Sequence, residues 1–228
     1  MLDGLAMPRA VAFDLDGTLI DSRDDIAAAC NHALAWSGRA ELSPETIGAF
    51  VGDGARNLLA RASRLDGASA ELDALLAEFI QFYAEHPIAR SRWMPGALDV
   101  LTALEARDVR LAVVTNKARE ITGPILRALG VASRFAAVYA GGDGPLKPNA
   151  EPMTRIMREL GSTSADTWLV GDGAQDVGAA RAVGCTSVAV LGGFHSESAL
   201  RAAGATRVVA SLAELDGIVR RSPLVRGG

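Results

Sequence analysis

The sequence contains little cysteine, no long apolar run and no excess of basic residues. Its only two cysteines, Cys30 and Cys185, lie far apart in 228 residues, which excludes a disulfide framework and favours a reducing compartment. No stretch approaches the ~20 apolar residues of a membrane-spanning helix. Residues 1–9 lack the basic start and apolar run of a signal peptide. We therefore expect a cytoplasmic protein with no membrane partner and a loose N-terminal extension.

The charge balance argues against a nucleic-acid partner. The chain has 23 Lys and Arg against 27 Asp and Glu, a net charge of −4, whereas nucleic-acid binding needs a basic surface. The hydrophobic content of 49% suits one globular domain or a core with a small accessory domain, as a monomer or a homodimer. The three histidines, His32, His86 and His195, show no metal-ligand spacing, and His86 is expected in a linker.

Short apolar runs alternate with helical patterns over most of the chain. The predicted strands are 10–14, 110–114, 136–140, 167–171 and 187–191, and helical periodicity covers 97–106, 151–160 and 174–183. Alternation of this kind predicts an α/β fold, a Rossmann-like doubly wound parallel sheet with helices on both faces.

The connection between the first two strands is far longer than a parallel crossover needs. Residues 21–92 carry helical patterns throughout, including an N-cap at Ser43 with Pro44 at the first helical position. We predict a helical cap domain at 21–92 inserted into a core formed by 8–20 plus 93–222. Since both connections leave the sheet where the first strand ends, the cap should form a lid over that edge.

Two carboxylates follow the first strand. Asp14 and Asp16 are two residues apart, so they share one side of an extended chain. Carboxylates this close repel each other unless a cation or a shared proton compensates. The pair therefore predicts a metal site, a nucleophile or an acid–base pair.

Polar residues also follow three other strands. Thr115 and Asn116 come after 110–114, where a hydroxyl and an amide at a helix start would donate to a phosphate. Lys147 lies in a Gly/Pro-rich loop, and Asp172 and Asp176 follow 167–171, one helical turn apart. Ligands of open α/β sheets bind at the carboxyl ends of strands, so we expect these residues to converge on one site.

The four segments, in this order, resemble the four motifs of the haloacid dehalogenase superfamily, most of whose members are Mg²⁺-dependent phosphatases. The matching stretches are 14–18, 115–116, 147–152 and 171–176. The sequence departs from the pattern at Ala150, where the third motif has proline, and at Gly173, where many members have serine. The resemblance covers about residues 10–210.

The resemblance implies a role for each acid. Asp14 matches the nucleophile that forms an aspartyl-phosphate, and Asp16 the general acid and base. The Asp14 and Asp172 side chains, with the main-chain carbonyl of Asp16, would hold Mg²⁺, a cation that prefers oxygen ligands. Asp176 would support the water ligands of the metal.

The resemblance also implies how a phosphorylated substrate is bound. Lys147 would neutralise the nucleophile and the phosphate together. Thr115 and the Asn116 amide would bind phosphate oxygens, and Thr18 would contact the substrate. Charge spread over three phosphoryl oxygens makes cations and positioning the main tasks of such a site.

Within the superfamily the chain is most similar to phosphoglycolate phosphatases. The similarity is carried by 21–22, 50–56, 83–87 and 94–97. It implies that Gly52 and Gly54 form a cap loop that touches the substrate, and that Arg56 pairs with the carboxylate of a small phosphorylated acid.

Other functions fit parts of the same pattern. A sugar-phosphate phosphatase or a β-phosphoglucomutase-like phosphotransferase would use the same four motifs. A dehalogenase is disfavoured because that branch has no acid at the position of Asp16. A non-catalytic, phospho-accepting regulatory module would also gather acids at strand ends, but receiver domains lack a long insert after the first strand.

Overall fold

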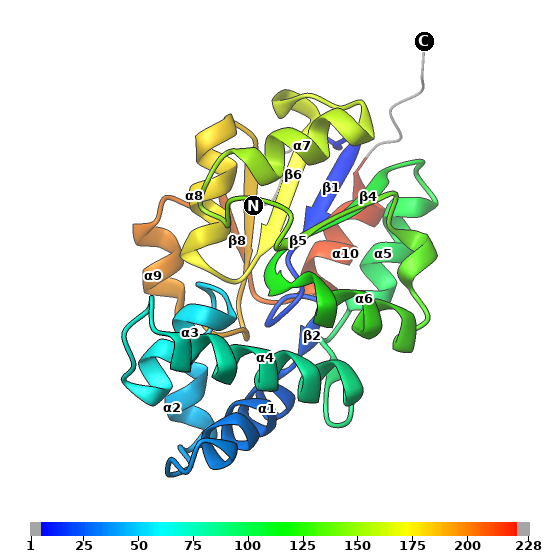
Figure 1. Ribbon diagram of the computed structural model, residues 1–228. Coiled ribbons are helices and arrows are strands. Elements are labelled where there is room, and N and C mark those ends of the chain that lie inside the picture. The colour runs from blue at the N-terminus through cyan, green and yellow to red at the C-terminus, as the bar shows by residue number, and fades with distance from the viewer. Residues whose placement is uncertain (1–5, 223–228) are drawn as a thin grey trace.

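The computed structural model describes residues 6–222. Its main sheet has six parallel strands in the order β5-β4-β1-β6-β7-β8 (Figure 1). The strands are β1 Ala10–Phe13, β4 Arg110–Ala118, β5 Ala137–Gly141, β6 Thr167–Gly171, β7 Thr186–Val190 and β8 Arg207–Val209. The predicted α/β class with a parallel sheet is confirmed. The sequence analysis did not predict β8, which is a three-residue edge strand.

Successive side chains of β1 point to opposite faces of the sheet and are buried in two separate hydrophobic cores, one on each face. Val11 and Phe13 join the larger core, to which α5 and α10 contribute, whereas Ala10 and Ala12 join a smaller core with α7 and α8. The helices outside the insert are α5 Ala97–Glu105, α6 Arg119–Ala128, α7 Glu151–Leu160, α8 Ala174–Val183, α9 Glu197–Ala202 and α10 Leu212–Arg221. Helices therefore cover both faces, as a doubly wound sheet requires.

Four helices lie in the sequence between two short strands, β2 Ile20–Asp21 and β3 Arg92–Trp93, and face the carboxyl ends of the main sheet (Figure 1). They are α1 Arg23–Trp36, α2 Pro44–Gly48, α3 Ala55–Ser63 and α4 Ala70–Glu85. Ser43 caps α2 through its side chain, as predicted, and His86 ends α4. The division into a core at 8–20 plus 93–222 and a cap at 21–92 stays a prediction.

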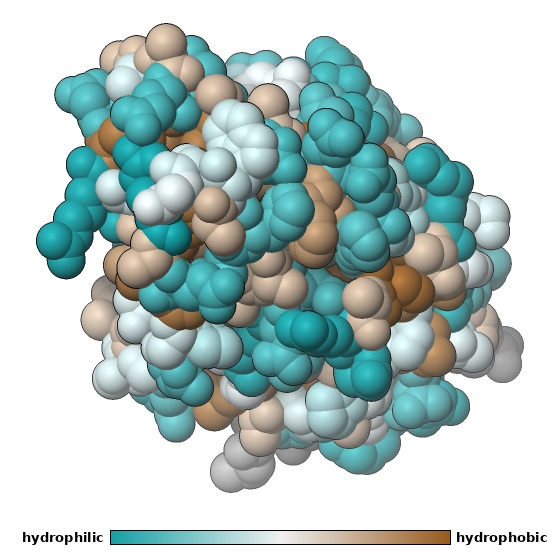
Figure 2. Space-filling model, turned by 60° about the horizontal axis from the view of Figure 1, so that its bottom comes forward, coloured by the Kyte–Doolittle hydropathy of each residue, from teal (hydrophilic) through white to brown (hydrophobic). Residues whose placement is uncertain are grey.

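The apolar sides of these helices are turned inward. Leu72, Leu75 and Phe79 of α4 are buried in the same core as Phe13 of the sheet. The outer surface seen from this end is mostly hydrophilic or neutral, with hydrophobic residues scattered over it (Figure 2). Within residues 6–222, no helix is long and apolar enough to cross a membrane. The start of the expected N-terminal extension, residues 1–5, lies outside the described residues.

The chain enters and leaves the insert at one place. β2 Ile20–Asp21 pairs antiparallel with β3 Arg92–Trp93. Beside this ribbon, the buried Asp25 carboxylate accepts hydrogen bonds from the amides of Arg90 (2.9 Å) and Ser91 (2.8 Å) and from the Ser91 hydroxyl (2.6 Å). One carboxylate thus ties the outgoing connection to the returning one.

Replacing Asp25 with alanine is expected to lower the free energy of unfolding by about 3 kcal/mol, because the Arg90 and Ser91 amides lose a charged acceptor in a buried place. Urea-induced unfolding followed by circular dichroism measures the change. Asp24→Ala, which removes an exposed carboxylate from the same helical turn, should change the stability by about 0.5 kcal/mol or less. Equal losses in the two variants would contradict the assignment.

Candidate active site

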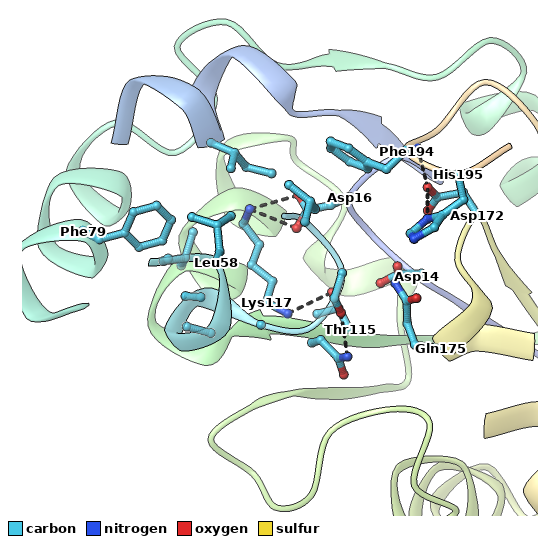
Figure 3. A pocket seen from close by; sticks show the side chains of 18 residues that line it. Asp14, Asp16, Leu58, Phe79, Thr115, Lys117, Asp172, Gln175, Phe194 and His195 are labelled. Atoms are coloured by element: carbon cyan, nitrogen blue, oxygen red, sulfur yellow. Dashed lines mark hydrogen bonds and ion pairs between the residues drawn. The ribbon is translucent and has the colours of Figure 1, made fainter. Parts of the chain in front are cut away.

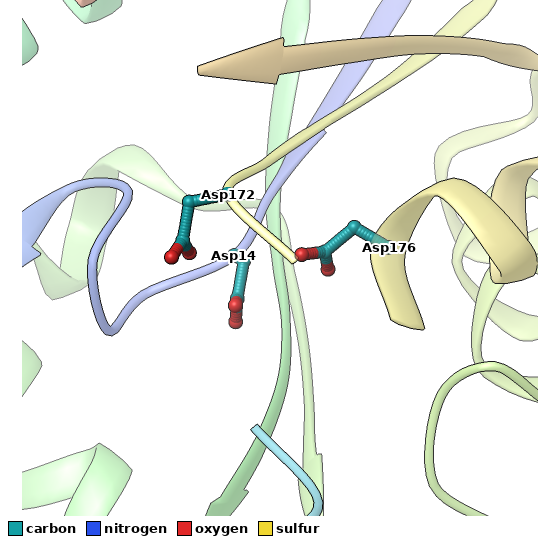
Figure 4. Close-up of side chains that lie close together, drawn as sticks. All are labelled: Asp14, Asp172 and Asp176. Atoms are coloured by element: carbon teal, nitrogen blue, oxygen red, sulfur yellow. The ribbon is translucent and has the colours of Figure 1, made fainter. Parts of the chain in front are cut away.

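Three adjacent strands bring the acidic residues together. β1 lies between β4 and β6 in the sheet, so Asp14, Thr115 and Asp172 emerge side by side at the carboxyl edge. Asp14, Asp172 and Asp176 each offer a carboxylate oxygen within 4.8 Å of the others, and all three residues are buried (Figure 4).

This cluster fits a divalent cation. Three buried carboxylates in one small volume repel each other strongly, and Asp14 Oδ1 accepts no well-directed hydrogen bond, although the Lys147 ammonium lies 3.0 Å away. A cation would relieve both costs, and carboxylate oxygens are the ligands that hard divalent ions prefer. Asp176, predicted to act on water ligands, lies within the cluster itself, whereas the Asp16 side chain points elsewhere.

The Lys147 ammonium compensates part of this negative charge. Its Nζ donates to Asp176 Oδ1 (2.6 Å) and to the Val114 carbonyl (2.6 Å), and it lies 3.0 Å from Asp14 Oδ1. Burial alone would lower the pKa of Lys147, but the Asp14 and Asp176 carboxylates raise it above its ordinary value. Lys147 therefore stays charged beside the expected nucleophile.

Burial is the largest influence on the pKa of Asp14. Its removal from water raises the pKa of Asp14 to about 6, against the opposing pull of the Lys147 ammonium. Burial likewise raises the pKa of Asp176. Because their pKa values are raised, Asp14 and Asp176 are easier to protonate than carboxylates exposed to water.

The Asn116 side chain fixes the loop that carries Lys147. Its Oδ1 accepts from the Lys147 amide (2.8 Å), and its Nδ2 donates to the Lys147 carbonyl (3.0 Å) and to the Gly52 carbonyl (2.8 Å). The expectation of a helix start at Thr115 is wrong. β4 continues through Ala118, where it pairs again with Gly141 of β5 after a register shift, and α6 begins only at Arg119.

Asp16 is held by a second lysine. Lys117 Nζ donates to both Asp16 oxygens (2.9 and 3.1 Å) (Figure 3). It also donates to the Tyr83 hydroxyl on α4 (2.9 Å), and the Ser22 hydroxyl donates to Asp16 Oδ1 (2.6 Å). Burial lowers the pKa of Lys117 although Asp16 opposes the shift. The sequence analysis gave Lys117 no role, even though it directly follows Thr115 and Asn116.

A cavity of about 50 Å³ lies between the carboxyl edge and the insert. Asp14, Asp16, Thr115, Asn116 and Asp172 line its core side, and the cap side is lined by Ile26, Val51, Gly52, Gly54, Ala55, Leu58 and Phe79. The structure thus brings the predicted cap-loop glycines to the pocket with the predicted acids.

The cap loop approaches the core closely at Gly52. This residue has φ +122°, and a Cβ there would lie 2.6 Å from Gln175 Nε2 of α8. Glycine is therefore required for the backbone conformation, whereas the end of the flexible Gln175 side chain could move away from a Cβ. Gly17, with φ +77°, allows a similar approach, since a Cβ there would lie 2.6 Å from Asp172 Oδ2.

Two predicted substrate-binding residues do not reach the pocket. Thr18 is fully buried and donates to Asp172 Oδ1 (3.0 Å), so it positions the carboxylate instead. Arg56 turns away along the outside of the insert, where it pairs with Asp73 and donates to the Gly67 carbonyl (2.9 Å). In this structure both side chains are therefore engaged by partners outside the pocket, and their roles in substrate binding stay predictions.

A loop beyond β7 adds residues that the sequence analysis did not place. Phe194 and His195 line the pocket (Figure 3). The Phe194 amide donates to Asp172 Oδ2 (2.7 Å), and His195 Nδ1 lies 3.9 Å from the same oxygen. Contact with Asp172 raises the pKa of His195. The only signal in the sequence was the position of these residues after a strand.

The family model of haloacid dehalogenase-like hydrolases matches residues 11–190. The chain belongs to this family. It is 39% identical over 218 residues to a protein of Chromobacterium violaceum named phosphoglycolate phosphatase, covering 93% of this chain and 96% of that protein. A protein of the same name from Rhodospirillum rubrum is 38% identical over 200 residues, covering 84% and 83% of the two chains.

Solved structures agree with this assignment. The crystal structure of a predicted phosphoglycolate phosphatase from Haemophilus somnus superposes with a TM-score of 0.86 at 28% identity, covering 94% of this chain and 99% of that one. The resemblance drawn from the four motifs is confirmed. The protein is a phosphatase of the haloacid dehalogenase-like type, and its acidic cluster could hold a divalent cation.

Binding of a divalent cation to this cluster, with Mg²⁺ as the probe, is expected to weaken as the pH falls through about 6. Below that pH the Asp14 carboxyl carries a proton that a cation must displace, whereas above it the carboxylate is already free. The apparent Kd should therefore be nearly constant above pH 7 and should rise by up to about tenfold per unit below pH 6. Calorimetric titration measures it. An affinity equal at pH 5 and pH 7 would contradict this expectation.

Proposed function

We propose that this phosphatase hydrolyses 2-phosphoglycolate with Mg²⁺, by way of an aspartyl-phosphate on Asp14. The proposal is supported chiefly by the convergence of Asp14, Asp172 and Asp176, two of which, Asp14 and Asp176, contact the Lys147 ammonium. Relatives named phosphoglycolate phosphatase support the choice of substrate. The small volume of the pocket is a further argument for a small phosphorylated metabolite.

In the first step an Asp14 carboxylate oxygen attacks phosphorus and the ester P–O bond breaks. Asp16 gives its proton to the departing alkoxide oxygen. Lys147 offsets the negative charge that Asp14 and the phosphoryl group bring together, and Thr115 with the Asn116 amide donates to phosphoryl oxygens. A divalent ion bound by Asp14 and Asp172, with the Asp16 carbonyl, would supply further charge neutralisation.

In the second step water attacks phosphorus and the bond to Asp14 breaks, which releases inorganic phosphate. Asp16, now a carboxylate, accepts the proton of the water. Residues 21–92 act as a cap that keeps bulk water out during the first step, so that the phosphoryl group reaches Asp14 before water attacks it.

Phosphate release from a substrate panel tests the proposal. With Mg²⁺, kcat/KM for 2-phosphoglycolate is expected to exceed that for glucose 6-phosphate and glucose 1-phosphate by tenfold or more, and Asp14→Asn should lower it by at least about 10³-fold, since the nucleophile is lost. Higher kcat/KM for the hexose phosphates would remove the proposed substrate. An unchanged rate in Asp14→Asn would remove the proposed mechanism.

The two tasks of Asp16 can be separated with p-nitrophenyl phosphate, whose leaving group needs no proton. Asp16→Asn is expected to release about one equivalent of nitrophenolate rapidly and then to turn over slowly, because only the second step still needs the base. Stopped-flow absorbance measures this burst. A burst phase slowed as strongly as steady-state turnover would contradict the assignment of the general acid and base.

A further inference from the structure

The chain contains only two lysines, and both lie at the site. Of its 23 Lys and Arg residues, all except Lys117 and Lys147 are arginines. Lys147 contacts Asp14 and Asp176, on the side where the phosphoryl group would bind. Lys117 has no part in the steps above, yet its side chain is only 5% exposed.

Lys117 occupies the cap-facing side of the pocket. Its Nζ lies 4.0 Å from the centroid of the Tyr83 ring and contacts the Tyr83 hydroxyl. Leu58 and Phe79 lie beside it, while Asp172 and His195 lie at the opposite side (Figure 3). An ammonium among apolar and aromatic groups attracts an anion more strongly than one in water, because the local dielectric constant is low.

Few basic side chains line the pocket and could pair with a carboxylate of the substrate. Among the described residues that line it, Asp14, Asp16 and Asp172 are acidic, and only Lys117 and His195 are basic. His195 is beside Asp172, and Arg56 is paired outside the pocket. A substrate that carries a carboxylate as well as a phosphate therefore meets one basic group on the cap-facing side, Lys117.

The position of Lys117 matches the shape of 2-phosphoglycolate. Lys117 Nζ lies within 3.1 Å of both Asp16 oxygens, and in the proposed reaction Asp16 protonates the leaving oxygen. The carboxylate carbon of 2-phosphoglycolate is two bonds from that oxygen, about 2.5 Å away. An ammonium that touches Asp16 thus lies beside the place where the substrate carboxylate arrives.

We infer that Lys117 binds the carboxylate of the substrate and selects phosphorylated acids over neutral phosphoesters. The inference rests on the proposed function. Binding transfers the ammonium from Asp16 to the substrate carboxylate, which frees the Asp16 carboxyl to turn to the leaving oxygen. A phosphoester without the carboxylate leaves Lys117 on Asp16.

The selectivity of a Lys117→Met variant tests the inference. Its kcat/KM is compared for 2-phosphoglycolate and 2-hydroxyethyl phosphate, which replaces the carboxylate by a neutral hydroxymethyl group. The ratio of the two values is expected to fall about 30-fold or more relative to wild type, the effect of losing a charged hydrogen-bond partner. A purely structural role for Lys117 would lower both values and leave the ratio unchanged. Arg119→Met, which removes an exposed cation paired with Asp143, should leave the ratio as in wild type.

A spectroscopic measurement covers the case in which the variant does not fold. Lysine labelled with ¹³C at Cε gives two side-chain signals in this chain, and proximity to the Tyr83 ring assigns the one from Lys117. In the non-hydrolysing Asp14→Asn background, 2-phosphoglycolate should shift the Lys117 signal more than 2-hydroxyethyl phosphate or inorganic phosphate does. Equal shifts for the three ligands would overturn the inference.

The outcomes separate this inference from the proposed function. An unchanged selectivity ratio in Lys117→Met, with a wild-type enzyme that prefers 2-phosphoglycolate, overturns the role of Lys117 alone. A wild-type enzyme that prefers hexose phosphates overturns the proposed substrate and this inference together.

Discussion

The contacts of the Lys147 ammonium hold the catalytic edge of the sheet together. This one group donates to the Val114 carbonyl within β4 and to Asp176 on α8, and it forms an ion pair with Asp14 after β1. Without it, the buried Asp14 and Asp176 carboxylates would lose the ammonium that offsets their charge, a costly arrangement in a medium of low dielectric constant. The geometry of the site therefore depends on a buried charge whose partners come from three separate elements.

The two lysines define two electrostatic regions of the site, and of the two only Lys117 lines the pocket. Lys147 sits among carboxylates that are suited to a metal and a phosphoryl group, whereas Lys117 sits between Asp16 and the aromatic and apolar side chains of the insert. A dianionic phosphate needs more positive charge around it than a single carboxylate does. The two regions also differ in charge. A slender ammonium fits both buried places, where the planar guanidinium of arginine would need a wider set of acceptors.

The sequence predicted the parts of the site that depend on strand order alone. Asp14, Asp172 and Lys147 follow strands, and the carboxyl ends of parallel strands meet whatever the surrounding side chains are. For Thr18 and Arg56, strand order does not decide which group each side chain contacts in the folded chain. Thr18 donates to Asp172 and Arg56 pairs with Asp73 because of distances that exist only in the folded chain. Lys117 was missed for the same reason, since its partners Asp16 and Tyr83 lie 101 and 34 residues away in sequence.

The side chain of Asn116 forms hydrogen bonds both to the insert and to the loop that carries Lys147. The Asn116 carboxamide uses one oxygen and one nitrogen to hold the Lys147 backbone, and the same nitrogen reaches the Gly52 carbonyl of the cap loop. Movement of the cap loop away from the core would remove one of these acceptors and leave the Nδ2 group with less support. The position of the Gly52 loop and the position of the Lys147 loop are therefore linked through the hydrogen bonds of one carboxamide.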